Sequence, residues 1–179
     1  MLLPTCPPKN KGGRYNSNGE NLGSGIRNPC RRRDHRQGRE IAAKLHPPVL
    51  LRLRGDLGSG KTTLTKGIIS GLGAAREEDV TSPTFNLVHE FRVPVPAGAP
   101  SDEARAACKV YHVDLYRIES FQGLESLGLE DALSEKAILI IEWPEHFTLR
   151  TDWPTIEIRL EHAGEDARRI SIMATKQDG

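Results

Sequence analysis

A glycine-rich segment at residues 55–62, GDLGSGKT, matches the pattern G-x-x-x-x-G-K-[ST] of a phosphate-binding loop. Its glycines would let backbone N–H groups turn inward to cradle phosphate oxygens at a helix N-terminus, where the helix dipole favours anions. The Lys61 side chain would reach the β- and γ-phosphates, and the Thr62 hydroxyl would be a ligand of Mg²⁺. The segment therefore predicts a nucleotide site built from Gly55, Asp56, Gly58, Ser59, Gly60, Lys61, Thr62 and Thr63.

Two carboxylates could complete the chemistry of such a loop. Glu142 follows the apolar run Ala137–Ile141, and the acidic partner of the metal stands at the end of a neighbouring apolar strand in folds of this kind. Asp114 shares one strand face with His112 and Tyr116, where it could position a water molecule. From the residues alone, Asp114 could equally be a carboxylate that faces solvent.

The segment Thr81–Phe85, TSPTF, offers hydroxyl groups that could contact the γ-phosphate or its metal, as switch segments of nucleotide hydrolases do. A plain turn explains the same composition equally well. Trp143 comes directly after Glu142, and its indole belongs either to the core or to a surface that faces a partner. We count Thr81 among the expected nucleotide contacts.

The elements around the loop have the order that a phosphate-binding loop needs. Residues 49–53, VLLRL, predict a buried strand, and Leu64, Ile68 and Leu72 recur at helical spacing after the loop until Gly73. Before the strand, a short amphipathic helix is expected with Asp34 as its N-cap, and it ends at Pro47-Pro48.

The remaining elements predict the α/β class. The continuous apolar run 137–141 indicates a central parallel strand that is covered on both faces. The fold we expect is a P-loop NTPase-like, mixed and largely parallel sheet flanked by helices, with an antiparallel C-terminal hairpin. The other segments are strands at 85–93, 110–117, 155–160 and 168–174, a helix at 124–134 and a surface loop at 94–109.

Charge divides the 179 residues into two unlike parts, although the formal net charge is only +1. Residues 1–40 hold nine basic and three acidic side chains, and the remainder holds 16 basic and 21 acidic ones. The stretch 1–33 lacks a periodic apolar face, so we expect a basic, disordered leader before a single ATPase domain at 34–176. Its run of arginines at 31–33 is either a solvated charge cluster or an arm that touches RNA.

Cysteine usage and hydropathy indicate a cytoplasmic protein. Cys6, Cys30 and Cys108 form no CxxC pair and leave an odd thiol, which suits a reducing compartment. The longest uninterrupted apolar run, 137–141, is far shorter than the ~20 residues of a membrane helix. No membrane association is expected.

Taken together, these segments resemble the TsaE (YjeE) ATPases of bacterial tRNA threonylcarbamoyladenosine synthesis. The resemblance rests on five motifs in the family's order: GDLGSGKTT at 55–63, TSPTF at 81–85, YHVDLYR at 111–117, LGLED at 127–131 and IIEWPE at 140–145. It implies an ATPase that binds ATP and Mg²⁺, is slow alone, and acts with the TsaB–TsaD heterodimer, meeting tRNA only through that complex.

The resemblance also implies roles for individual residues. It makes Lys61, Asp114 and Glu142 catalytic, Thr62 and Glu142 the metal-linked pair, and Thr81–Thr84 a switch-like segment. Trp143 corresponds to an aromatic residue at the nucleotide site or the partner surface. The sequence departs from the family at Asp34, where relatives carry a threonine that helps to hold the nucleotide.

Two other functions fit a phosphate-binding loop. A small-molecule P-loop kinase would need an arginine-rich lid, and residues 94–109 hold only Arg105 and Lys109 beside Asp102 and Glu103. A nucleotide-dependent interaction module with negligible turnover is the second alternative. Hydrolysis measured with and without the partner proteins distinguishes these functions.

Overall fold

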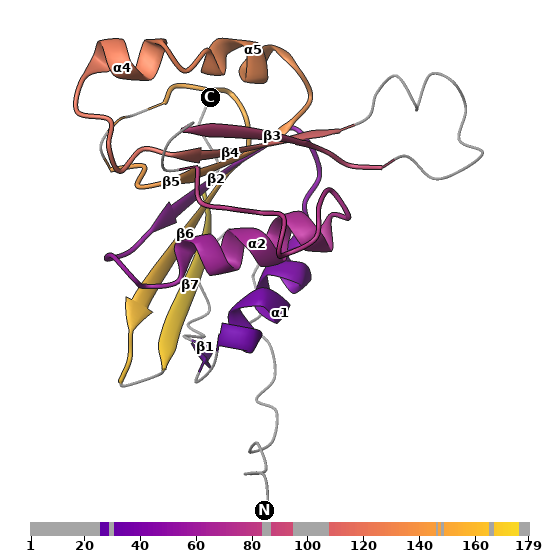
Figure 1. Cartoon of the computed structure of the whole chain (residues 1–179), viewed down its shortest axis with the longest axis vertical. Coiled ribbons are helices and arrows are strands. Elements are labelled where there is room, and N and C mark those ends of the chain that lie inside the picture. Colours follow the sequence, from indigo (N-terminus) through magenta and orange to yellow (C-terminus); the bar gives the residue numbers. More distant parts are fainter. Residues whose placement is uncertain are drawn as a thin grey trace, which may run out of the picture.

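The computed structural model describes residues 26–28, 31–83, 87–94, 108–145, 147, 149–164 and 167–175 (Figure 1). Outside them lie residues 1–25 of the predicted leader, Thr84 and Phe85 of the predicted switch segment, and most of the predicted loop at 94–109. Within the described residues, no helix has both the length and the apolar character that crossing a membrane requires.

One mixed sheet forms the centre of the described part of the chain, with its strands in the order β1-β7-β6-β2-β5-β4-β3. The four central strands are parallel, because β2 pairs with β5 and β6 and β4 pairs with β5. The hairpin β6–β7 and the pairs β1–β7 and β3–β4 are antiparallel. This confirms the predicted fold class. The strands are β1 (Ile26–Asn28), β2 (Val49–Arg54), β3 (Val88–Arg92), β4 (Lys109–Asp114), β5 (Ile138–Glu142), β6 (Thr155–His162) and β7 (Arg168–Thr175).

Helices cover both faces of the sheet, as Figure 1 shows. Helices α1 (Arg31–Ala42) and α2 (Lys61–Gly71) pack on one face, and α4 (Phe121–Glu125) and α5 (Leu129–Ser134) pack on the other. Along β5, Ile138 and Ile140 belong to the core under α1 and α2, whereas Leu139 and Ile141 belong to the core under α4 and α5. Burial on both faces explains why this strand is continuously apolar.

The structure corrects the predicted end of the leader. Ile26–Asn28 forms a strand that pairs with the outer edge of β7, and α1 begins at Arg31, so the prediction of disorder is wrong for these two stretches. A strand needs a free edge of the sheet, which sequence periodicity does not reveal. Asp34 is therefore no N-cap: it lies in the first turn of α1, and its side chain is buried.

Other elements differ from the prediction only in extent. The expected helix at 124–134 is two short helices, because Gly128 between them has φ 63°, outside the helical range. The strand expected at 110–117 ends at Asp114, and the strand expected at 85–93 begins at Val88. Because β4 ends at Asp114, this residue lies next to the end of β5.

Helices α1 and α2 touch through glycines, and this contact carries a stability prediction. A Cβ at Gly67 would lie 2.8 Å from the Cα of His35, and a Cβ at Gly38 would lie 2.6 Å from the carbonyl carbon of Gly67. Because backbone must move, Gly67→Ala is expected to lower the free energy of unfolding by about 2 kcal/mol despite the better helix propensity of alanine. Thermal and urea unfolding measure the change.

Gly123→Ala is the matched control for this prediction. Gly123 also lies in a helix, but the nearest atom to its Cβ would be the Ser120 hydroxyl oxygen at 3.3 Å, which belongs to the N-cap side chain and not to the backbone. Its free energy of unfolding should change by less than about 0.5 kcal/mol or rise. Equal stability of the Gly67 and Gly123 variants would contradict the proposed close packing of the helices.

Candidate functional site

The glycine-rich loop connects the end of β2 to the start of α2, as the motif requires. Gly55, Gly58 and Gly60 have φ values of 146°, 76° and 101°, which side chains with a Cβ rarely adopt. A Cβ at Gly55 would also collide with the Leu160 carbonyl oxygen. Ser59 is completely buried, so its side chain helps to form the loop's interior.

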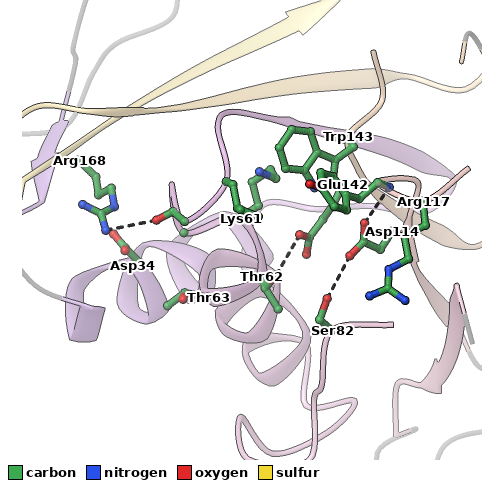
Figure 2. A pocket seen from close by; sticks show the side chains of 14 residues that line it. Asp34, Lys61, Thr62, Thr63, Ser82, Asp114, Arg117, Glu142, Trp143 and Arg168 are labelled. Carbon is green, nitrogen blue, oxygen red and sulfur yellow. Dashed lines mark hydrogen bonds between the residues drawn. The ribbon is translucent and has the colours of Figure 1, made fainter. Parts of the chain in front are cut away.

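A pocket of about 390 Å³ opens beside this loop (Figure 2). It lies at the carboxyl ends of β4 and β5, at the N-terminus of α2 and beside Arg168 of β7, the edge at which open α/β sheets bind ligands. Its walls carry both charge signs and two aromatic side chains. The lining residues are Asp34, Leu57, Gly58, Gly60, Lys61, Thr62, Thr63, Ser82, Asp114, Tyr116, Arg117, Glu142, Trp143 and Arg168.

Lys61 is the cation at the centre of the pocket. Its Nζ donates hydrogen bonds to the carbonyl oxygens of Gly55 and Asp56 at 2.6 and 2.9 Å, and it lies 3.6 Å from the centroid of the Trp143 ring. Burial lowers the pKa of the Lys61 ammonium, and nearby carboxylates, of which Glu142 contributes most, oppose that shift. These contacts hold the ammonium across the loop, where an anion would meet it.

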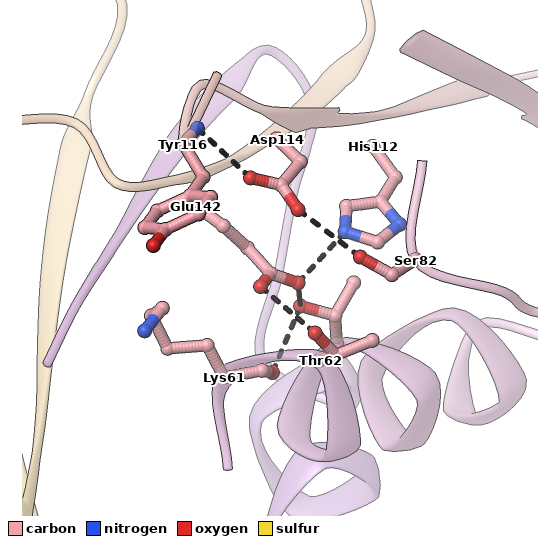
Figure 3. Close-up of polar contacts among 8 residues, drawn as sticks. Lys61, Thr62, Ser82, His112, Asp114, Tyr116 and Glu142 are labelled. Atoms are coloured by element: carbon pink, nitrogen blue, oxygen red, sulfur yellow. Dashed lines mark hydrogen bonds and ion pairs between the residues drawn. The ribbon is translucent and has the colours of Figure 1, made fainter. Parts of the chain in front are cut away.

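Glu142 is buried at the end of β5 and is held by side chains from two other elements (Figure 3). Its Oε2 accepts a hydrogen bond from the Thr62 hydroxyl at 2.9 Å. Its Oε1 pairs with Nε2 of His112 at 2.8 Å and lies 3.1 Å from the Thr65 hydroxyl, whose single hydrogen is shared between Oε1 and the equally distant Lys61 carbonyl oxygen. A buried carboxylate needs such donors, and here they fix its orientation toward the start of α2.

Asp114 is a second buried carboxylate in the pocket, and different groups hold it. Its Oδ2 accepts from the Ser82 hydroxyl at 3.0 Å, and its Oδ1 accepts from the backbone N–H of Tyr116 at 3.0 Å. Figure 3 shows the carboxylates of Asp114 and Glu142 near one another, where β4 and β5 end. The serine comes from the segment TSPTF, so this segment contacts the site through Ser82.

Trp143 contributes both to the pocket and to the edge of the core. Its ring lines the pocket, stacks on Tyr116 with centroids 4.9 Å apart, and packs against the core beneath α4 and α5. Its backbone has φ 62°, an uncommon value for a residue with a side chain. Strain of this kind concentrates at functional sites.

The structure brings most of the expected site residues together but not all. Gly58, Gly60, Lys61, Thr62, Thr63, Asp114, Glu142 and Trp143 line the pocket. Gly55, Asp56 and Ser59 form the loop without lining it, and Thr81 is exposed and does not line the pocket. The predicted nucleotide contact of Thr81 therefore has no support from this arrangement, and its neighbour Ser82 takes the place beside Asp114.

The end of the pocket away from Glu142 carries charges that the motifs did not predict. Arg168 donates from Nη2 to the Gly58 carbonyl oxygen at 3.4 Å, and Figure 2 shows its guanidinium beside the Asp34 carboxylate. A Cβ at Gly60 would lie 3.3 Å from Asp34 Oδ2 and 3.8 Å from Arg168 Nε. Both side chains thus border the loop where it enters α2.

The oxygen atoms of Thr62 and Glu142 suit Mg²⁺ better than a metal whose ligands are all protein side chains. The Thr62 hydroxyl donates its hydrogen to Glu142, so its oxygen lone pairs stay available to a cation. Among the described residues, no group of three or more His, Cys, Asp or Glu side chains is arranged to hold a metal ion. Mg²⁺ typically takes one or two protein oxygens and completes its shell with phosphate oxygens and water.

Fold and site define a P-loop NTPase-like protein of the α/β class. A family model described as threonylcarbamoyl adenosine biosynthesis protein TsaE matches residues 31–170. The chain belongs to the TsaE family, and its role therefore lies in tRNA threonylcarbamoyladenosine biosynthesis.

Individual relatives agree with this assignment. The tRNA threonylcarbamoyladenosine biosynthesis protein TsaE of Haemophilus influenzae is 35% identical over 137 residues, which cover 75% of this chain and 77% of the relative. The protein of the same name from Bacillus subtilis is 35% identical over 133 residues and 74% of each chain. The crystal structure of Bacillus subtilis YdiB has a TM-score of 0.58 at 27% identity, covering 83% of both chains.

Proposed function

We propose that this protein binds ATP with Mg²⁺ in the pocket beside residues 55–63 and hydrolyses it to support the TsaB–TsaD heterodimer in tRNA modification. One observation carries the proposal: the left-handed glycines Gly58 and Gly60, the Lys61 ammonium and the linked pair Thr62–Glu142 all line one pocket. Such a pocket offers backbone donors, a lysine ammonium and a metal ligand to a triphosphate.

Each polar group has a defined task in this proposal. Lys61 exchanges its carbonyl partners for the β- and γ-phosphates, while Thr62 and Glu142 hold the metal side of the nucleotide. Thr62 and Glu142 would hold Mg²⁺, and when bound it would supply positive charge to offset that of the phosphates. Phosphate transfer to water rather than to a metabolite agrees with a family role in tRNA modification.

Asp114 is the carboxylate that we assign to the attacking water. A carboxylate has about four acceptor positions. Among the described residues, three donor groups contact Glu142, one of them the Thr65 hydroxyl that it shares with the Lys61 carbonyl oxygen, and two donor groups contact Asp114. Asp114 therefore keeps more capacity to accept a proton-bearing ligand. A partner that reorders residues 81–85 would act on this carboxylate through Ser82.

The family role supports the partners that we propose. A protein of threonylcarbamoyladenosine biosynthesis acts on tRNA, and we propose that it does so in the cytoplasm and only through the TsaB–TsaD complex. Hydrolysis should be slow in isolation, because we propose that the partner acts on Asp114 through the segment that carries Ser82. The threonylcarbamoyl transfer itself takes place elsewhere in the complex.

Single-turnover hydrolysis of ATP, with and without purified TsaB–TsaD, tests the proposal. We expect measurable hydrolysis that requires Mg²⁺ and rises at least tenfold when the heterodimer is added. A matched reaction with EDTA controls for the metal, and a reaction with TsaB–TsaD alone controls for contaminating ATPases.

Two other results would favour the alternatives. Nucleotide-dependent binding to TsaB–TsaD with no hydrolysis would identify an interaction module. Transfer of the γ-phosphate to an added metabolite, without stimulation by the heterodimer, would identify a kinase. Either result would overturn the hydrolytic function that we propose.

A further inference from the structure

His112 lies in β4, completely buried, beside the carboxylate of Glu142 (Figure 3). Its Nε2 is 2.8 Å from Glu142 Oε1, and the two side chains are 0% and 2% exposed. His112 is not among the residues that line the pocket. It therefore touches Glu142 from behind, out of reach of a nucleotide.

The hydrogen bonds around Glu142 define which ring nitrogen carries the proton. Thr62 donates to the carboxylate, so Glu142 acts as an acceptor, and the bond from His112 uses Nε2–H. The other ring nitrogen, Nδ1, is buried and has no hydrogen-bond partner among the described residues. A hydrogen on Nδ1 would be buried without an acceptor, which costs free energy. The bonding pattern fits the Nε2–H tautomer.

We infer that His112 is a positioning residue of the nucleotide site, which acts by holding Glu142 turned toward Thr62. The inference rests on the proposed ATPase function. His112 and Thr65 share Oε1, which leaves Oε2 to Thr62 alone. Without the histidine, the carboxylate loses a donor in a buried place, rotates to replace it, and no longer fixes the Thr62 hydroxyl.

A contact of this kind belongs to the outer shell of a metal site. Removing such a partner typically costs 10–100-fold in metal affinity or activity. The effect should appear in kcat and in the Mg²⁺ concentration for half-maximal rate. The KM for ATP should change little, because His112 itself does not line the pocket and meets it only through Glu142.

Two variants that carry the same amide donor at different distances from Glu142 test whether the position of the donor matters. In His112→Gln the amide nitrogen reaches about where Nε2 lies, whereas in His112→Asn it is one methylene short. We expect His112→Asn to lower kcat about 10–100-fold, with KM for ATP within about threefold of wild type. His112→Gln should retain kcat within about fivefold. Thermal unfolding of both variants checks that each is folded at the assay temperature.

Other patterns would overturn the inference. Folded Gln and Asn variants with equal losses would show that reaching Glu142 does not matter, and wild-type kcat in both would show that His112 has no positioning role. A rise in KM without a fall in kcat would indicate a contact with the nucleotide instead.

A measurement on the wild-type protein tests the same contact without any turnover. Nitrogen-15 NMR of the histidine rings reports which ring nitrogens carry a hydrogen, and we expect a hydrogen on His112 Nε2. An Nε2 without a hydrogen would overturn the inference even if ATP is hydrolysed. Absence of ATP hydrolysis, with the Nε2–H tautomer present, would instead contradict the proposed function and leave the contact with Glu142 established.

Discussion

Replacing Lys61 by alanine is expected to raise the Kd for ATP by about 100-fold or more. The Lys61 ammonium now donates two hydrogen bonds to loop carbonyls, and the same donors are free to turn to phosphate oxygens. Hydrogen bonds to charged groups contribute about 1.5–3 kcal/mol each, so losing two of them accounts for a change of this size. Isothermal titration calorimetry measures the Kd. The ring of Trp143, 3.6 Å from Nζ, also offers a fluorescence signal.

Lys66→Ala is the matched control for this experiment. Lys66 lies on the same helix, α2, but does not line the pocket. Its replacement removes the same charge from the chain and should leave the Kd for ATP within about twofold. Loss of ATP affinity in both variants would mean that net charge rather than contact decides binding. Unchanged affinity in Lys61→Ala would contradict the placement of the phosphates at the loop.

The parts of the site that the sequence predicted are those that local order determines. A glycine loop between a buried strand and a helix forms from adjacent residues, so Lys61 and Thr62 could be placed without knowledge of distant contacts. The apolar run before Glu142 predicted a strand covered on both faces, and its position beside β2 brings that carboxylate within 2.9 Å of the Thr62 hydroxyl. Order along the chain and hydropathy were sufficient here.

Residues that reach the pocket from distant elements could not be placed in this way. Arg168 comes from β7, and Asp34 from the first turn of α1. Their positions follow from the strand order and from how closely α1 packs on α2, which residue spacing does not encode. Ser82 was part of a predicted hydroxyl segment, but only the course of the backbone decides that Ser82, and not Thr81, faces Asp114.

His112 shows a different limit of prediction from sequence. Its place on the polar face of a strand was evident, but that pattern suits both a solvent-facing residue and a buried one. Strand β4 pairs with β3 on one side and with β5 on the other, and the His112 side chain is completely buried. In this buried position the His112 side chain supports the Glu142 carboxylate.

Glu142→Gln is expected to lower the single-turnover rate of ATP hydrolysis by about 100-fold while ATP affinity stays within about tenfold. Glutamine keeps the shape but removes the negative charge and half of the acceptor sites. The Thr62 hydroxyl can still find an acceptor, so the phosphate loop should remain intact. The metal side of the nucleotide loses its buried carboxylate, which changes the transition state more than binding.

Glu145→Gln provides the comparison that makes this loss specific. Glu145 lies three residues further on, pairs with Arg54 at 3.6 Å, and does not line the pocket. Its replacement should leave the rate within about twofold, since exposed ion pairs of this kind contribute little. If Glu142→Gln hydrolysed ATP at the wild-type rate, the link from Thr62 through Glu142 to the metal would be wrong. If the Glu142→Gln variant lost ATP binding instead, Glu142 would maintain the structure of the loop rather than take part in turnover. A lost rate with retained binding assigns Glu142 to turnover, because the same carboxylate fixes Thr62 and is itself held from behind by His112.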